Sequence, residues 1–386
     1  MKLQSEYPNL EGVTYLNTAS IGLVPSTVIG KAHYFEAEIA RRGTAAMDEE
    51  TEVAVFESAR QAAASLLNAP IANIALTSSS TEALCQVAWW LQPRRGENVV
   101  SLEREFPSVV YPWYRIAEDT RMEVRLAPAP DDGSAVDLDG VLDLLDSGTK
   151  AICISHVQYF SGERMDLGRL SDAAHAHGAL LIVDASQSAG QVPIDVQRSG
   201  IDVLIAGGYK FLCGTFGAAI CYLSPRVLEG LRPPFVGWRS VMEPFNFDAR
   251  YKTLAQSAKR LEFSTTAYAA AIALGAACDY IRDLEPAKIM ESNSSLAARL
   301  IEGLEEYEVP VVTPKEPSAR AGVVTARFPG YDGAQIASEF GERGVVVSSR
   351  GDATRFSFHF YNTTDDVDEA LAVTGEIARR TAGCQL

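Results

Sequence analysis

Seven short apolar runs between residues 73 and 224 constrain the fold more than any other feature of this sequence. The runs span residues 73–79, 97–103, 122–128, 150–157, 179–186, 202–208 and 218–224. Between most of them lie stretches in which apolar residues recur three and four positions apart, the spacing of an amphipathic helix. Because strands that are apolar along their length and alternate with helices are buried on both faces, the pattern predicts an α/β fold with a mostly parallel, seven-stranded sheet.

The last two runs predict a local exception to this parallel pattern. Residues 202–208 and 218–224 are separated by only about ten residues, too few for the helical crossover that parallel neighbours require. We therefore expect these two strands to pair antiparallel and to form the edge of the sheet.

The sequence pattern changes after about residue 225. Residues 225–248 are rich in proline and glycine and predict a loop. Helical spacing returns around 265–283 and 286–306, and short strands then alternate with helices near 333–343 and from about 365. The sequence thus predicts an N-terminal segment that packs with the small domain, a large domain and a smaller C-terminal α+β domain, spanning residues 1–20, 21–255 and 256–386.

The composition favours a cytoplasmic protein with small-molecule partners. Lys and Arg number 34 against 50 Asp and Glu, so a net charge of -16 disfavours nucleic acids and anionic membranes as partners. The N-terminus lacks an apolar signal core, and the apolar runs are too short to span a bilayer. The six cysteines show no paired spacing and are expected to be reduced, and no histidine or cysteine spacing predicts a metal site.

Lys210 and Asp184 follow two neighbouring strands of the predicted sheet. Lys210 comes directly after the run at 202–208, and partial burial there would lower the pKa of its amine and make it nucleophilic. A solvated loop lysine is the alternative. Asp184 ends the run at 179–186, where it either faces the same rim of the sheet or caps a turn.

A third polar cluster, residues 78–81, follows the first strand and begins a helix. Ser79 and Glu82 fit a capping box, which alone explains the cluster. The same hydroxyls and free N–H groups at a helix start also suit a phosphate. A phosphate site, an acid and a lysine amine together are what a phosphorylated pyridine aldehyde needs, so the set predicts pyridoxal 5′-phosphate as cofactor.

Residues 183–217, VDASQSAGQVPIDVQRSGIDVLIAGGYKFLCGTFG, resemble the signature of the class V aminotransferase superfamily, within the fold-type-I pyridoxal-phosphate enzymes. Further similar segments follow in the family's order along nearly the whole chain, at residues 15–25, 77–84, 155–162, 260–268 and 354–363. The resemblance implies a fold-type-I enzyme with a large domain that binds the cofactor and a small C-terminal domain.

The resemblance also assigns the cofactor contacts. It makes Lys210 the lysine that forms the Schiff base and moves the proton at the substrate Cα, and pairs Asp184 with the ring nitrogen. It further implies that Gln187 donates a hydrogen bond to the phenolic oxygen, that Ser80 and Thr81 bind the phosphate, and that Phe106 stacks on the ring.

The remaining assignments concern the substrate and a second subunit. Arg355 is expected to bind the substrate α-carboxylate bidentately, and Asn17 to contact the substrate. Arg350 either binds a second anionic group on the substrate or is a surface arginine. Ser264 or Thr265 is expected to reach the phosphate of a partner protomer, which implies a homodimer.

Some positions depart from the cysteine desulfurases and selenocysteine lyases of this superfamily. Residues 344–358 carry no cysteine before Arg355, Cys384 is near the terminus, and Ser348 and Ser349 are far weaker nucleophiles. Persulfide formation by that route is therefore not expected.

Two aromatic positions are more similar to kynureninase. Tyr209 and Phe106 stand where desulfurases have histidines, and Tyr209 and Trp238 would help to hold the phosphate; plain aromatic packing is the alternative. We predict an enzyme that acts on a small L-amino acid, as a lyase cleaving a β-substituent in the manner of a C–S lyase. An epimerase similar to isopenicillin N epimerase, or an aminotransferase, remains the alternative. A nicotinamide-dependent enzyme is disfavoured because no G-x-G-x-x-G follows the first strand.

Overall fold

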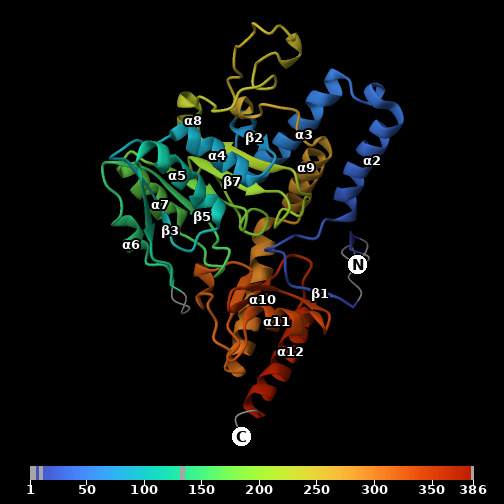
Figure 1. Cartoon of the computed structure of the whole chain (residues 1–386). Coiled ribbons are helices and arrows are strands. Elements are labelled where there is room, and N and C mark those ends of the chain that lie inside the picture. The colour runs from blue at the N-terminus through green and yellow to red at the C-terminus, as the bar shows by residue number, and fades with distance from the viewer. Residues whose placement is uncertain (1–5, 8–11, 131–134, 384–386) are drawn as a thin grey trace.

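The computed structural model describes residues 6–7, 12–130 and 135–383, which form a large α/β domain and a smaller α+β domain (Figure 1). The large domain contains a seven-stranded sheet in the order β2-β8-β7-β6-β5-β3-β4. Its strands are β2 (Ile74–Thr77), β3 (Asn98–Leu102), β4 (Glu123–Ala127), β5 (Thr149–Ser155), β6 (Leu180–Asp184), β7 (Val203–Gly207) and β8 (Ala219–Leu223). All neighbours are parallel except β8, which is antiparallel to β2 and β7, so the predicted sheet is confirmed.

The antiparallel pairing of β7 with β8 is confirmed, but its predicted place at the edge is wrong. β2 lies outside β8 and pairs with it from Ile74↔Tyr222 to Thr77↔Ala219. β2 and β8 are far apart in the sequence, so neither strand signals the other as its partner. The turn that ends β7 therefore lies inside the sheet, with strands on both sides.

Helices cover both faces of the sheet. Helices α3 (Glu49–Leu67), α6 (Leu138–Leu142), α7 (Leu167–Ala176) and α9 (Tyr268–Asp283) pack on one face, and α4 (Ser80–Leu91), α5 (Pro107–Thr120) and α8 (Pro225–Gly230) on the other. The prediction of a loop from residue 225 is wrong over α8, because Pro225 fits the first helical position and the Ser224 side chain caps the helix by accepting from Val227 N. The rest of that segment projects from the large domain (Figure 1).

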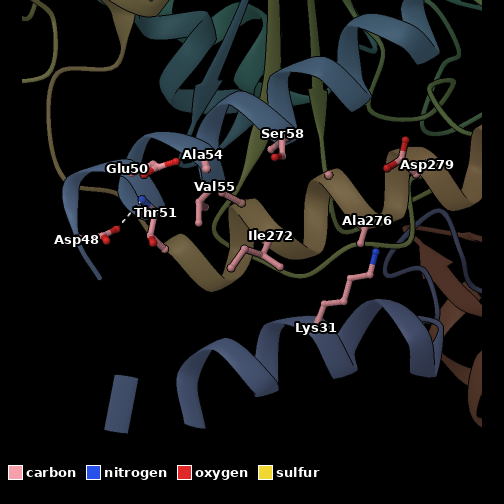
Figure 2. A pocket seen from close by; sticks show the side chains of 13 residues that line it. Lys31, Asp48, Glu50, Thr51, Ala54, Val55, Ser58, Ile272, Ala276 and Asp279 are labelled. Atoms are coloured by element: carbon pink, nitrogen blue, oxygen red, sulfur yellow. Dashed lines mark hydrogen bonds between the residues drawn. The ribbon is translucent and has the colours of Figure 1, made fainter. Parts of the chain in front are cut away.

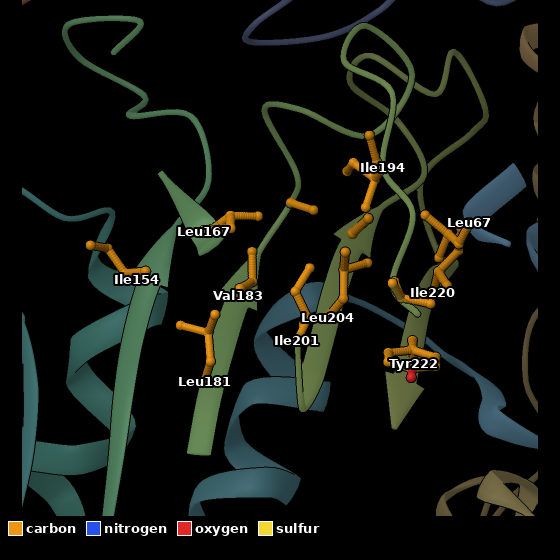
Figure 3. Packing of buried hydrophobic residues seen from close by; sticks show 14 of the residues in the cluster. Leu67, Ile154, Leu167, Leu181, Val183, Ile194, Ile201, Leu204, Ile220 and Tyr222 are labelled. Atoms are coloured by element: carbon orange, nitrogen blue, oxygen red, sulfur yellow. The ribbon is translucent and has the colours of Figure 1, made fainter. Parts of the chain in front are cut away.

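The core follows from the alternation of side chains along buried strands. Leu181 and Val183 of β6 face the layer of α3, α7 and α9, together with Leu204 of β7 (Figure 3). Ile182 of β6 and Ile205 of β7 face the layer of α4 and α5. Each such side chain stabilises the folded state by roughly 1.5–3 kcal/mol when it is buried away from water. This burial fixes where the strands end, and the polar residues follow directly after those ends.

The smaller domain is built on a three-stranded antiparallel sheet in the order β11-β12-β9. Its elements are β9 (Val323–Ala326), β10 (Val345–Val346), β11 (Ser348–Arg350), β12 (Ala353–Ser357), α10 (Pro286–Glu306), α11 (Gly333–Gly341) and α12 (Thr364–Gly383), close to the predicted positions. α9 packs against α3 in the core of the large domain, although the predicted small domain begins at residue 256. The domain boundaries themselves stay a prediction, and residues 1–5 and 8–11 of the N-terminal segment lie outside the described residues.

Other expectations concern the cysteines and the membrane. Cys85, Cys153, Cys213, Cys221 and Cys278 are free thiols, and Cys384 lies outside the described residues. Across the described ranges, no helix combines the length and apolar character needed to cross a membrane.

Residues 16–22, the crossing segment, join the two domains. The segment follows β1 (Thr14–Tyr15), which pairs with β10, and Leu16 N donates to Val346 O at 2.9 Å in the small domain. At its other end Gly22 N donates to Tyr209 O at 2.8 Å in the large domain. A Cβ atom on Gly22 would lie 2.0 Å from Lys210 O, so only glycine permits this approach.

We predict that Gly22→Ala pushes the crossing segment off the Lys210 turn. The substitution should lower the free energy of unfolding by about 1–3 kcal/mol, the usual cost of overpacking a close contact, as measured by urea denaturation. Gly30→Ala on α2 (Ser26–Arg42) is the matched control, because no atom lies within 4 Å of its added Cβ. This control should be neutral or slightly stabilising, since alanine favours helix. Equal stability of the Gly22→Ala protein and wild type would contradict the prediction.

Candidate active site

Residues from four segments converge beyond the ends of the central strands. Asp184 is the last residue of β6, and Lys210 lies three residues after the end of β7. Ser80 begins α4, and Phe106 is the cap residue before α5. Because the carboxyl ends of β6 and β7 lie at the same edge of the sheet, the structure brings the predicted acid and lysine to one rim.

Lys210 is the electrostatic centre of this site. Its Nζ lies 5.1 Å from the centroid of the Phe106 ring and 5.8 Å from that of Tyr209. Burial lowers the pKa of the Lys210 amine to about 8; the charge of Asp184 opposes this shift, and the charges of Arg355 and Arg350 add to it. The amine therefore holds its neutral, nucleophilic form at far lower pH than a solvated lysine does.

Asp184 and Gln187 leave acceptor atoms available. Asp184 is 6% exposed, and its Oδ1 accepts from Ser186 N at 2.8 Å. Its other oxygen, Oδ2, takes part in no hydrogen bond or ion pair within the described part of the chain. Gln187 donates from Nε2 to Ala19 O at 3.0 Å, and its Oε1 is buried without a partner.

The start of α4 forms a small cradle of hydroxyl groups. Ser80 Oγ lies 3.0 Å from Ser186 Oγ, which also accepts from Gly207 N at 3.2 Å. A Cβ atom on Gly207 would lie 3.1 Å from Ser80 Oγ, so the glycine keeps this space open. Thr81 Oγ1 is paired with Ser108 Oγ at 2.8 Å. The first N–H groups of a helix have no partner within it, so this end suits an anion.

The predicted capping box is only half formed. Ser79 accepts from Glu82 N at 3.1 Å as expected, but the Glu82 carboxylate accepts from Ser78 N at 2.8 Å rather than from Ser79 N. Ser186 was not among the predicted residues. Its place two positions after Asp184 was the only signal in the sequence.

Two arginines form the other end of the site. Arg355 on β12 is 1% exposed and donates to Tyr159 O at 2.8 Å and to Ser20 Oγ at 2.7 Å, while its Nε has no partner. Arg350 on β11 donates to the same Ser20 Oγ at 3.1 Å. Burial, and then the charge of Arg350, hold the pKa of Arg355 well below its usual range. Asn17, also predicted, pairs by its backbone with Ser357 and has a buried, unpartnered Oδ1.

Arg350 and Arg355 together have the chemistry of an anion site. Neither guanidinium forms an ion pair with a carboxylate of the described residues. A buried positive charge without a counter-charge is costly, and a bound carboxylate would offset that cost. Ser20, which both arginines share, was not predicted, because nothing in its local sequence distinguishes it from a turn serine.

Three predicted residues lie elsewhere within this chain. Ser264 and Thr265 are exposed and form no side-chain hydrogen bond with the described residues. Trp238 packs on Phe245 at 5.8 Å between ring centroids and on the Arg239 guanidinium at 5.1 Å. Their roles toward a cofactor stay predictions, as does that of Tyr209, whose ring stacks on Phe216 at 4.5 Å.

A cavity of about 500 Å³ lies away from these residues, between α2, α3 and α9 (Figure 2). Its floor is formed largely by small residues, and Lys31, Asp48, Glu50 and Asp279 lie around it. Neither Lys210 nor either arginine of the candidate site lines it, so the cavity is separate from that site.

Comparisons with known proteins find relatives that match nearly the whole chain. The family model described as aminotransferase class-V matches residues 14–370. A probable cysteine desulfurase of Pyrococcus abyssi is 25% identical, over 99% of this chain and 98% of the relative. A probable cysteine desulfurase of Synechocystis is 29% identical, over 92% and 89%.

Solved structures share the fold. The apo cysteine desulfurase of Thermococcus onnurineus has a TM-score of 0.88 at 25% identity and covers 98% of both chains. A cystine C–S lyase, solved with its product cysteine persulfide, has a TM-score of 0.88 at 22% identity and covers 96% of this chain and 99% of its own. These matches confirm the predicted fold class.

We predict that Lys210 loses its proton near pH 8 in the cofactor-free protein. Its acetylation rate, followed by mass spectrometry of the Lys210 peptide, should rise through this pH and then level off. Asp184→Asn should lower the pKa further, because the carboxylate favours the ammonium form, and Arg350→Met should raise it. Acetylation of the exposed Lys31 controls for the reagent. A rate at Lys210 that still climbs steeply beyond about pH 10 would contradict the prediction.

Proposed function

The chain belongs to the aminotransferase class-V family, a family of pyridoxal-phosphate-dependent enzymes, and on this premise we propose that it is a lyase that cleaves a β-substituent, such as a C–S-linked group, from an L-amino acid. The observation that carries the proposal is the set of Lys210, Asp184 and the unpaired Arg355 around one site. Lysine supplies the nucleophile, the acid supports a positive ring, and the arginine holds a carboxylate.

The residues present fit the cofactor. Ser80, Thr81 and the start of α4 would hold the phosphate in the cradle that Gly207 keeps open. The free oxygen of Asp184 would accept from the ring N–H, and the second N–H of Gln187 Nε2, besides the one donated to Ala19 O, would serve the phenolic oxygen. Bound pyridoxal phosphate supplies an electron sink for negative charge at the substrate Cα.

Each side chain of the site has its own role in the proposed reaction. Lys210 would hold the cofactor covalently and would take the proton from the substrate Cα, a role that its lowered pKa suits. Asp184 would keep the ring nitrogen protonated. Phe106, whose ring lies over the Lys210 amine, would stack on the cofactor ring. Arg355 orients the α-carboxylate, and Arg350, beside it, would bind a second anionic group of the substrate.

The β11–β12 hairpin supports a lyase without a persulfide-forming cysteine. Arg350 pairs with Ala353, so only residues 351–352 lie in the turn, too few for a mobile loop that carries a nucleophile. Burial raises the pKa of Cys213, the thiol nearest to Lys210 in sequence, and that of Cys153. Such thiols stay protonated and react poorly.

The exposure of Ser264 and Thr265 supports a homodimer. Polar groups that this chain leaves without partners would reach the phosphate in a second protomer, and Trp238 and Tyr209 would help to hold it. A cytoplasmic location remains part of the proposal.

We predict that the purified protein, after incubation with pyridoxal phosphate, has a visible absorbance band that borohydride bleaches, with the cofactor then fixed on the Lys210 peptide. Lys210→Ala should abolish turnover. With L-cysteine a lyase releases pyruvate, ammonia and sulfide, and with L-cystine it releases pyruvate, ammonia and cysteine persulfide. Appearance of a D-amino acid would instead indicate an epimerase, and transfer of the amino group to a keto acid an aminotransferase. A protein that stays colourless would refute the proposal.

Arg355→Leu should raise the KM for the amino acid about 100-fold, because two charge-assisted hydrogen bonds to the carboxylate are lost. Arg350→Leu should raise KM only for substrates that carry a second anionic group, so the neutral-side-chain substrate serves as its control. Steady-state kinetics on the two substrate classes measures both effects. An unchanged KM in the Arg355→Leu protein would show that the α-carboxylate binds elsewhere.

A further inference from the structure

Glu105 is a buried carboxylate to which the roles above give no part. It directly precedes Phe106 and is 7% exposed. Its Oε1 accepts from Ser155 N at 2.6 Å and from Gln158 Nε2 at 2.8 Å. Its Oε2 accepts from Ser155 Oγ at 2.5 Å and from Phe106 N at 3.2 Å. Four neutral donors thus converge on one side chain inside the protein.

The four donors belong to three different elements. Phe106 N lies at the start of α5, Ser155 at the end of β5, and Gln158 in the loop that follows, residues 156–163. Ser155 pairs in register with Asp184 on the neighbouring strand β6. Glu105 therefore fastens the start of a helix, the end of a strand and a loop at one point beside the site.

Glu105 holds the start of α5 and the loop of Gln158 in place, and both segments bear on residues that have roles in the proposed function. The Phe106 ring faces the Lys210 amine and meets the Tyr159 ring edge-on, at 5.6 Å between centroids. Tyr159 is next to Gln158 in the loop, and its carbonyl oxygen accepts from Arg355 Nη1 at 2.8 Å. The same carboxylate thus supports the ring that stacks on the cofactor and the carbonyl that orients the arginine.

We propose that Glu105 is a positioning residue that couples the cofactor-stacking ring of Phe106 to the substrate-binding guanidinium of Arg355. The proposal rests on the function proposed above. If the hydrogen bonds to Glu105 were weakened, the Phe106 ring and the Tyr159 carbonyl would both shift. Cofactor affinity and substrate affinity should therefore change together.

The geometry requires a carboxylate rather than an amide at this position. Each oxygen of Glu105 accepts two hydrogen bonds, one of them from a backbone N–H. A glutamine in either orientation would turn its NH₂ group toward one of those backbone donors, and that donor would lose its partner. Burial and the nearby charge of Asp184 raise the pKa of Glu105, while the hydrogen bonds from Ser155 and Gln158 oppose the shift.

Three variants separate this role from general loosening of the fold. Glu105→Gln should raise both the Kd for pyridoxal phosphate, measured by visible absorbance, and the KM for the amino acid about tenfold, the effect of one lost buried hydrogen bond. Gln158→Leu removes the hydrogen bonds of this side chain to Glu105 and to Ser155 O but keeps the other three donors to Glu105, so it should raise KM with the cofactor Kd unchanged. Glu163→Gln is the matched control, since Glu163 is also buried in this loop but accepts from Val136 N instead. It should change neither constant.

A second readout does not need the cofactor. In the cofactor-free protein, hydrogen exchange in peptides covering residues 104–110 and 155–160 should be faster in Glu105→Gln at both places, and unchanged there in Glu163→Gln. This readout keeps the coupling testable if the wild-type protein takes up no cofactor, a result that would refute the proposed function itself.

Three results would overturn the coupling. One is a Glu105→Gln protein with wild-type Kd, KM and exchange rates. Another is a Glu163→Gln protein that reproduces both changes, since Glu105 would then act only through loop stability. If Glu105→Gln does not fold, Gln158→Leu decides, and a wild-type KM in that variant would refute the link to Arg355.

Discussion

The rest of the site depends on the close crossing of residues 16–22 over the Lys210 turn. Gly22 N donates to Tyr209 O, and Ala19 O accepts from Gln187, so the crossing segment lies directly on the residues that follow β6 and β7. Ser20 lies between these two contacts, and its Oγ accepts hydrogen bonds from Arg350 and Arg355 of the small domain. One short segment therefore sets the spacing between the lysine of one domain and the two arginines of the other, and small backbone shifts there would change the site as a whole.

Three positively charged groups lie close together in this site. Lys210, Arg350 and Arg355 are close enough for their charges to act on one another, and two of them lower the pKa of the third. Asp184 and Glu105 are the carboxylates nearby, and Glu105 is already satisfied by neutral donors. Positive groups held this close without counter-charges destabilise the fold. In the function proposed above, a phosphate at the start of α4 and a substrate carboxylate at the arginines would offset that cost.

The sequence predicts what local pattern controls and misses what distant pairing controls. Buried strands are continuous apolar runs, so the strands and the places of Lys210 and Asp184 at their ends followed directly. β2 at the edge of the sheet did not, because its partner β8 is distant in sequence. The role of Glu105 could not be predicted for the same reason. Within "LEREFPS" it resembles a surface charge, and the residues of β5 and the next loop that donate to it become its neighbours only in the folded chain.

The β11–β12 hairpin shows how a change of loop length can change chemistry. Arg350 pairs with Ala353 and Ser348 with Arg355, so side chains of these four positions lie on one face of the hairpin. A turn of only two residues holds that face rigid and places a second guanidinium beside the first. Where desulfurases in this superfamily carry a nucleophilic cysteine on a mobile loop, this chain thus has a fixed cation. Under the function proposed above, a fixed cation that cannot accept sulfur would instead hold an anionic substrate while the bond at its β-carbon breaks.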